Sequence, residues 1–202
     1  SALMTRGYYE MPSDHIYIRP ESWDKPFEAP EHVCSSYDNC HVPWGSTHEK
    51  TWHLVKTLPH VSGLFVWTGF DYLGEPTPYW WPSRSSFFGI VDLAGFPKDI
   101  YYMYKSEWTN EPVLHIFPHW NWKEGEPVDI WAYYNNADEV ELYLNGKSLG
   151  VRQKTDSTYH VSWRVPFTPG TLKAVSRLGG KEVLVKEIHT AGEPARLVLT
   201  PD

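Results

Sequence analysis

Short segments in which apolar and polar residues alternate fill the second half of the chain, and this pattern constrains the fold more than any other feature. Strict alternation is typical of a strand that buries one face. Asn145-Gly146 stands between two such runs, where a two-residue hairpin turn needs positive φ at both positions. The alternating segments after about residue 110 are 113–117, 128–134, 140–144, 161–165, 172–175 and 183–188. They predict an antiparallel β-sandwich.

A single apolar run dominates the first half of the chain. Residues 63–67, GLFVW, are bounded by turn-forming residues and are too few for a buried helix. Such a run is typical of a strand that is buried on both faces in a parallel sheet. Residues 1–46, by contrast, are rich in Pro, Ser and Asp without a sustained period. They predict a long loop excursion, of the kind that often carries binding residues.

Two helices are predicted on either side of the apolar run. Ser46 and Glu49 have the spacing of a capping box, and Pro59 ends the helix that they begin. Pro97 stands where a first helical residue is favoured. An apolar stripe at helical spacing follows it, formed by Ile100, Met103, Tyr104 and Trp108. The order helix, buried strand, loop, helix indicates a piece of α/β structure.

Charge and motif content exclude several classes of function. The net charge is -7, with no run of Lys or Arg, so nucleic acid is not expected as a partner. No apolar segment reaches the length of a membrane span, so no membrane partner is expected either. The 10 histidines form no HExxH pattern and no Gly-rich phosphate loop occurs, so we predict neither a metal nor a cofactor. Cys34 and Cys40 are interpreted as ordinary thiols, with a disulfide as the alternative.

Aromatic residues make up 16% of the chain, with 11 Trp, 13 Tyr and 8 Phe. Their flat apolar faces can stack on the C–H side of a pyranose ring. The densest group of Trp and Tyr lies within residues 67–81. This composition favours a protein that binds carbohydrate.

Three stretches of the chain resemble family 2 glycoside hydrolases, particularly bacterial β-galactosidases. Residues 63–99, GLFVWTGFDYLGEPTPYWWPSRSSFFGIVDLAGFPKD, resemble the eighth strand and following loop of the catalytic (β/α)8 barrel. Residues 139–150, EVELYLNGKSLG, resemble a hairpin of the immunoglobulin-like domain that follows the barrel. Residues 1–7, SALMTRG, resemble the segment directly after the seventh strand. The resemblance covers most of the chain.

The resemblance implies an activity that this chain cannot perform alone. Retaining hydrolysis needs two carboxyl groups, one as acid/base and one as nucleophile, roughly 5–5.5 Å apart. By the resemblance both catalytic glutamates lie upstream of residue 1, so we expect no catalytic residue in this chain. The expected substrate of the parent enzyme is a terminal β-galactoside, with β-mannoside and β-glucuronide as alternatives.

What remains, by the resemblance, is the part of the site that holds the sugar. Trp67 matches the tryptophan that forms a wall of the glycosyl subsite, with a core aromatic as the alternative. Asp71 and Glu75 could accept hydrogen bonds from sugar hydroxyls, although Asp71 could equally be structural. The remaining candidates are Trp80 and Trp81, as an outer platform, and Arg6, with a solvent-facing role as its alternative. Phe88 stands where some β-galactosidases have a cation-binding asparagine, so no cation site is expected.

The expected domains are a barrel portion over residues 1–109, an immunoglobulin-like sandwich over 110–191 and the start of a further domain or linker over 192–202. Residues 196–200, RLVLT, predict the first strand of that further domain. Two other functions stay open for the sandwich: a carbohydrate-binding module that uses exposed tryptophans, or a module that braces the barrel, which we favour. The expected partners are a glycan and the remaining domains of the parent, with a homo-oligomer possible. A periplasmic or extracellular location is expected, because members of the family frequently act on extracellular glycans.

Overall fold

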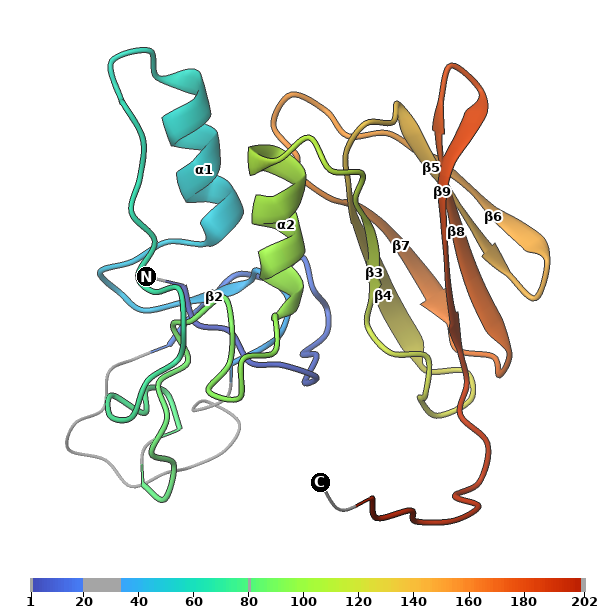
Figure 1. The fold of residues 1–202 in the computed structure, drawn as a ribbon, viewed down its shortest axis with the longest axis horizontal. Helices are drawn as coiled ribbons and strands as arrows, with labels where there is room; N and C mark the ends of the chain where they lie inside the picture. The colour runs from blue at the N-terminus through green and yellow to red at the C-terminus, as the bar shows by residue number, and fades with distance from the viewer. Residues whose placement is uncertain (1, 20–33, 80, 201–202) are drawn as a thin grey trace.

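The computed structural model describes residues 2–19, 34–79 and 81–200 of the chain (Figure 1). A lobe of loops and two helices lies against one side of a β-sandwich (Figure 1). The helices are α1 (His48–Thr57) and α2 (Asp99–Trp108). A short parallel pair, β1 (Tyr17–Ile18) and β2 (Cys40–His41), belongs to the same lobe. Among the described residues, neither helix has the length or apolarity to cross a bilayer.

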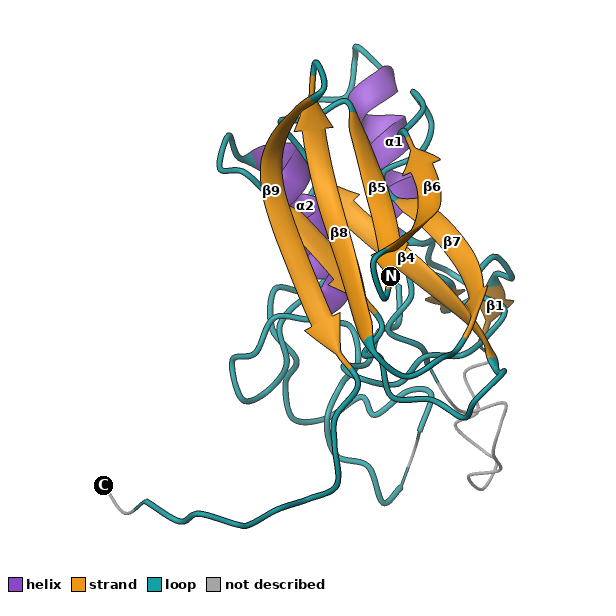
Figure 2. Ribbon diagram, turned by 90° about the vertical axis from the view of Figure 1, so that its right-hand side faces the viewer, coloured by secondary structure: helices purple, strands orange, loops and turns teal. Residues whose placement is uncertain are grey.

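Two antiparallel sheets form the sandwich, as the alternating pattern predicts. One sheet has the order β3-β4-β7, with β3 (Leu114–Phe117), β4 (Pro127–Tyr134) and β7 (Val161–Pro166). The other has the order β6-β5-β8-β9, which Figure 2 shows side by side, with β5 (Glu139–Leu144), β6 (Lys147–Arg152), β8 (Thr171–Leu178) and β9 (Lys181–His189). The hairpin turn between β5 and β6 has φ of 51° at Asn145 and 80° at Gly146. The predicted type I′ turn is therefore confirmed.

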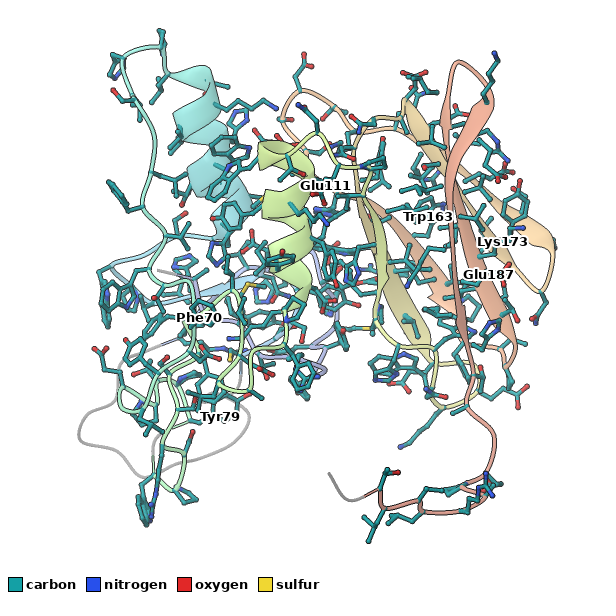
Figure 3. The ribbon with its side chains drawn as sticks, in the orientation of Figure 1. Phe70, Tyr79, Glu111, Trp163, Lys173 and Glu187 are labelled. Carbon is teal, nitrogen blue, oxygen red and sulfur yellow. The ribbon has the colours of Figure 1, made fainter. Side chains whose placement is uncertain are left out.

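The inner faces of the two sheets enclose the core of the sandwich. Trp163 is buried between them, and its indole Nε1 donates to the carbonyl of Gly150 at 3.1 Å (Figure 3). The other side chains of this core are apolar residues that alternate along β3, β4, β5, β7 and β8, among them Ile116, Val128, Ile130, Val140, Leu142, Val161, Leu172 and Ala174. Because each strand buries every second residue here, the sequence pattern and the core coincide.

The outer face of the three-stranded sheet is covered by the helical lobe. Trp131 on β4 is buried on this side, where His160 stacks on it with ring centroids 3.5 Å apart. His160 also joins the lobes through its Nδ1, which lies 2.7 Å from the carboxylate of Glu49 on α1. The apolar part of the interface consists of Met4, Tyr37, Ile100, Met103, Tyr104, Phe117, Trp131, Tyr133 and Tyr159. A second apolar core therefore joins the helical lobe to the sandwich.

Helix α1 begins differently from the prediction. Ser46 and Glu49 do not form a capping box, since the N-cap residue is Thr47 and its side chain makes no cap hydrogen bond. The carboxylate of Asp38 takes that role, accepting the backbone N–H groups of His48 at 2.9 Å and Glu49 at 2.7 Å. A buried carboxylate satisfies amides at the positive end of the helix dipole, which a local serine would otherwise satisfy.

Asp38 is expected to make the stability of the chain depend on pH. Burial, and then the nearby charge of Glu49, raise the pKa of Asp38 from 3.8 to about 7. The folded state therefore binds a proton more tightly than the unfolded state, so this group's contribution to stability is present at low pH and is lost as the pH rises through about 7. We expect the wild-type chain to lose stability between pH 5 and 7.5 relative to Asp38→Asn, measured by urea unfolding at each pH. Parallel pH profiles for the two proteins would contradict this.

Two predicted strands are absent, and both corrections have the same physical reason. Residues 63–67 form no strand, and no backbone hydrogen bond joins 62–67 to another described residue. Phe65 is fully exposed, and residues 196–200 are exposed and also form no strand. A strand requires a neighbour for its ladder, and the described part of the chain supplies none at either place. Helix α2, in contrast, forms as predicted but begins at Asp99, two residues after Pro97.

Candidate functional site

Trp67, Tyr72 and Glu75 form a hydrogen-bonded row at the surface of the helical lobe. The indole Nε1 of Trp67 donates to the hydroxyl of Tyr72 at 3.2 Å, and that hydroxyl donates to the carboxylate of Glu75. The rings of Trp67 and Tyr72 meet edge to face with centroids 6.0 Å apart. Trp67 remains 61% exposed. The row therefore presents an open aromatic face beside a carboxylate, which suits stacking on a sugar and accepting its hydroxyls.

Sequence reasoning missed Tyr72. Burial, and then the hydrogen bond to Glu75, raise the pKa of its phenol, so it stays protonated and can donate at neutral pH. Its position between Trp67 and Glu75 in a short aromatic loop was the available signal. The tyrosine matters because it links the two side chains that the sequence singled out.

Asp71 does not join this row. Its carboxylate forms an ion pair with the Nζ of Lys98 at 2.7 Å and accepts the backbone N–H of Gly89 at 2.8 Å. Both charged side chains are buried, and Lys98 also donates to the carbonyl of Met4 at 2.7 Å. Burial lowers the pKa of Lys98, while the hydrogen bond to Asp71 opposes this. These contacts support the structural alternative for Asp71, because the pair ties the loop after Trp67 to α2 and to the N-terminal segment.

Gly89 allows the close approach that this pairing needs. A Cβ atom added at Gly89 would lie 2.2 Å from the backbone nitrogen of Asp71 and 2.5 Å from the carbonyl carbon of Phe70. No side chain fits at that distance, so only glycine lets the two backbone segments pack.

The neighbouring Phe88 is buried in a cluster with Leu3, Val42 and both cysteines. Cys34 and Cys40 are free thiols, as predicted, and burial raises the pKa of Cys40 to about 11.

Among the described residues, the remaining candidates make no hydrogen bond to the row. Trp81 is 64% exposed, with the guanidinium of Arg84 5.1 Å from its ring centroid, and Trp80 lies outside the described residues. Arg6 forms an ion pair with Asp92 at 2.6 Å.

Two cavities lie near the candidate residues. One, of about 280 Å³, is lined by Arg6, Asp71, Asp92 and Lys98 among others. The other, of about 140 Å³, has Trp67 among its lining residues. Figure 3 labels Phe70 and Tyr79, which belong to the loop that follows Trp67. Among the described residues, no group of three or more His, Cys, Asp or Glu side chains is arranged to hold a metal.

Comparison with known proteins gives a consistent assignment. Residues 125–184 match a family described as a domain of unknown function, DUF4982. The chain is 63% identical over its whole length to Beta-galactosidase BoGH2A of Bacteroides ovatus, of which it covers 24%. It is 38% identical to a putative beta-glucuronidase of Formosa agariphila over 95% of the chain and 19% of that protein. The chain thus spans about a quarter or less of the length of these relatives.

Solved structures agree with the sequence relatives. A beta-glycosidase from Bacteroides vulgatus matches 96% of this chain and 27% of its own, with a TM-score of 0.81 and 33% identity. A glycosyl hydrolase family 2 member from Bacteroides cellulosilyticus matches 63% of this chain and 21% of its own, with a TM-score of 0.57 and 32% identity. Because the sequence relatives and the solved structures agree, we conclude that this chain belongs to glycoside hydrolase family 2.

Proposed function

We propose that this chain is the part of a longer retaining glycoside hydrolase that holds the sugar, and that the whole enzyme releases terminal β-galactosyl units. The observation that carries this proposal is the 63% identity to a β-galactosidase along all 202 residues. Cleavage of β-glucuronides is the first alternative, supported by the 38% identity to a putative beta-glucuronidase. Cleavage of β-mannosides is the second alternative. Neither catalytic glutamate belongs to this chain in our assignment, so the chain alone is inactive.

Residues 1–109 are, in this proposal, the C-terminal portion of a (β/α)8 barrel. Residues 63–67 would be its last strand, and exposed Phe65 supports this because an inward-facing side chain lacks cover until the other strands are present. Residues 110–191 would be the immunoglobulin-like domain, and 192–202 the start of a further domain or linker. The match to the Bacteroides vulgatus structure over 96% of the chain supports the arrangement of the first two parts.

Each candidate residue then has a role at the mouth of the barrel. Trp67 is the wall on which the glycosyl ring stacks, and Tyr72 and Glu75 bind its hydroxyls. Trp81, together with Trp80, forms an outer platform, and Arg6 borders the mouth. Asp71 does not contact sugar in this scheme but holds the loop that carries the others.

The sandwich has a bracing role. Its shared core with α1 and α2, and the contact of His160 with Glu49, support this because they fix the helices that pack behind the barrel strands. A carbohydrate-binding module would need exposed tryptophans on the sandwich, whereas Trp120, Trp131 and Trp163 are at most 5% exposed. We therefore favour bracing over binding.

The proposed activity is tested by assaying the full-length protein and this chain side by side on nitrophenyl β-galactoside, β-glucuronide and β-mannoside. We expect the full-length protein to hydrolyse the galactoside fastest, with retention of configuration, and this chain to hydrolyse none. If the full-length protein preferred another of the three glycosides, the proposed substrate would change, but the proposed enzyme class, a retaining glycoside hydrolase, would stand. Hydrolysis by the isolated chain, or none by the full-length protein, would overturn the proposal.

A further inference from the structure

The loop that carries the row is hydrogen-bonded along its length to a second segment of the helical lobe. Residues 68–75 run beside residues 84–91. Tyr72 of the row is bonded twice to Ser86, because its N–H donates to the Ser86 hydroxyl at 3.0 Å and its carbonyl accepts the Ser86 N–H at 2.8 Å. Further backbone hydrogen bonds join Thr68 to Phe88 and Ile90, Gly69 and Asp71 to Val91, and Gly74 to Arg84. The second segment therefore fixes the backbone of the row.

The ammonium of Lys98 joins this pair of segments to a third one. Lys98 is 1% exposed, and its Nζ lies 2.7 Å from the carboxylate of Asp71 and 2.7 Å from the carbonyl of Met4. Its backbone N–H donates to the carbonyl of Ile90 at 3.0 Å. The N–H of Met4 in turn donates to the carbonyl of Phe87 at 2.8 Å. One residue thus contacts the loop of the row, the segment beside that loop and the N-terminal segment.

The burial of this charge turns the contacts into a geometric restraint. A buried ammonium is stable only while a counter-charge and hydrogen-bond acceptors stay within reach, since water does not replace them. The carboxylate of Asp71 is restrained in the same way, because it also accepts the backbone N–H of Gly89 at 2.8 Å. Moving the loop away from the N-terminal segment would separate Lys98 from Asp71 or from Met4. An apolar side chain of the same size would impose no such restraint.

We propose that Lys98 is a positioning residue for the sugar-stacking face of Trp67, because its ammonium fixes the loop of the row relative to the N-terminal segment. The inference rests on the proposed function, in which Trp67 is a wall of the sugar subsite and the N-terminal segment leaves the barrel strand next to 63–67. A misplacement of about 1 Å costs up to roughly 100-fold in rate. Loss of the ammonium therefore lowers turnover more than it lowers substrate binding.

The test uses a double substitution, because Lys98→Met alone leaves Asp71 without its counter-charge. In Lys98→Met/Asp71→Asn no buried charge remains, and the amide oxygen at position 71 still accepts from Gly89, whereas the carbonyl of Met4 has lost its donor. In the full-length protein we expect kcat on the preferred nitrophenyl glycoside to fall about tenfold, with KM changed less than about threefold. Both proteins are assayed below their melting temperatures. Unchanged kcat in the folded double variant would overturn the inference.

Lys154→Met is the matched control. Lys154 has the same two kinds of partner, because its Nζ donates to the carbonyl of Tyr134 at 2.8 Å and lies 3.4 Å from the carboxylate of Glu107. Burial lowers the pKa of both ammonium groups. Lys154, however, joins the sandwich to α2. We expect Lys154→Met to lower the melting temperature and to leave kcat within about twofold. A similar tenfold fall in kcat for this control would overturn the inference, because any loss of stability would then have the same effect.

The coupling to Trp67 is tested by adding Trp67→Ala to the double variant. If Lys98 acts through the stacking face, the tenfold loss should largely disappear in the Trp67→Ala background. A full, additive loss would overturn the inference and leave the proposed function standing. Inactive full-length wild type, or Trp67→Ala with unchanged kcat/KM, would instead reject the proposed function and the inference with it.

A further measurement needs no variant and applies even if the double variant does not fold. A crystal structure of the full-length wild-type protein should show the Nζ of Lys98 within hydrogen-bonding distance of both the carboxylate of Asp71 and the carbonyl of Met4. An ammonium that contacts only one of these two groups, or that is open to solvent, would overturn the inference.

Discussion

Trp67→Ala is expected to lower kcat/KM of the full-length hydrolase roughly 100-fold, which corresponds to about 2.7 kcal/mol of transition-state stabilisation. The reason is the proposed role of Trp67 as the wall of the sugar subsite, together with its 61% exposure, which leaves the core little affected by the substitution. The loss is measured by steady-state kinetics on the preferred nitrophenyl glycoside. The melting temperature should change little.

Trp108→Ala is the matched control for this substitution. Trp108 is 49% exposed at the far end of α2, where it packs on Trp52 and Tyr104. Removing it should reduce stability and leave kcat/KM within twofold, the opposite pattern to that of Trp67→Ala. If Trp67→Ala left kcat/KM unchanged, Trp67 would be a packing residue, and the proposed sugar wall would have to be sought elsewhere.

Lys98→Met is expected to destabilise the chain by roughly 3–5 kcal/mol, the largest stability effect that we predict for a single charge removal. Both members of the Lys98–Asp71 pair are buried, so the substitution leaves a buried carboxylate without its counter-charge. The backbone carbonyl of Met4 loses its donor as well. The free energy of unfolding from urea titration measures the effect.

A surface ion pair and a double substitution control for this prediction. Arg6→Met removes an ion pair with Asp92 in which half of the arginine is exposed, and should change stability by about 1 kcal/mol or less. Adding Asp71→Asn to Lys98→Met should recover part of the loss, because no buried charge then remains. A loss below about 1 kcal/mol for Lys98→Met alone would mean that water reaches Asp71.

Local pattern was sufficient to predict the sandwich. Alternation buries every second residue whatever the neighbouring strand, so residues such as Val140 and Leu142 indicated the buried face before any pairing was known. The Asn145-Gly146 turn was equally local, since it depends on φ at two adjacent residues. Both helices followed from spacing and proline positions, although α1 begins one residue and α2 two residues later than predicted.

The candidate site was only partly predictable. Resemblance indicated Trp67 and Glu75, but Tyr72, which hydrogen-bonds to both, became visible only with coordinates. Asp71 and Lys98 are 27 positions apart, and no sequence rule pairs residues at that separation on a loop and a helix N-terminus. The role of Asp71 as a buried anchor was for this reason undecided from sequence.

The sequence by itself determined which segments have one buried face, where the hairpin turns, and which family the aromatic loop resembles, because these depend on neighbours along the chain. The tertiary structure alone decided that Asp38 caps α1 from ten residues away, that residues 63–67 have no strand beside them in the described part of the chain, and that Tyr72 links Trp67 to Glu75. Hydrogen bonds and burial depend on atoms that folding brings close from distant parts of the chain, and the order of residues does not specify those distances.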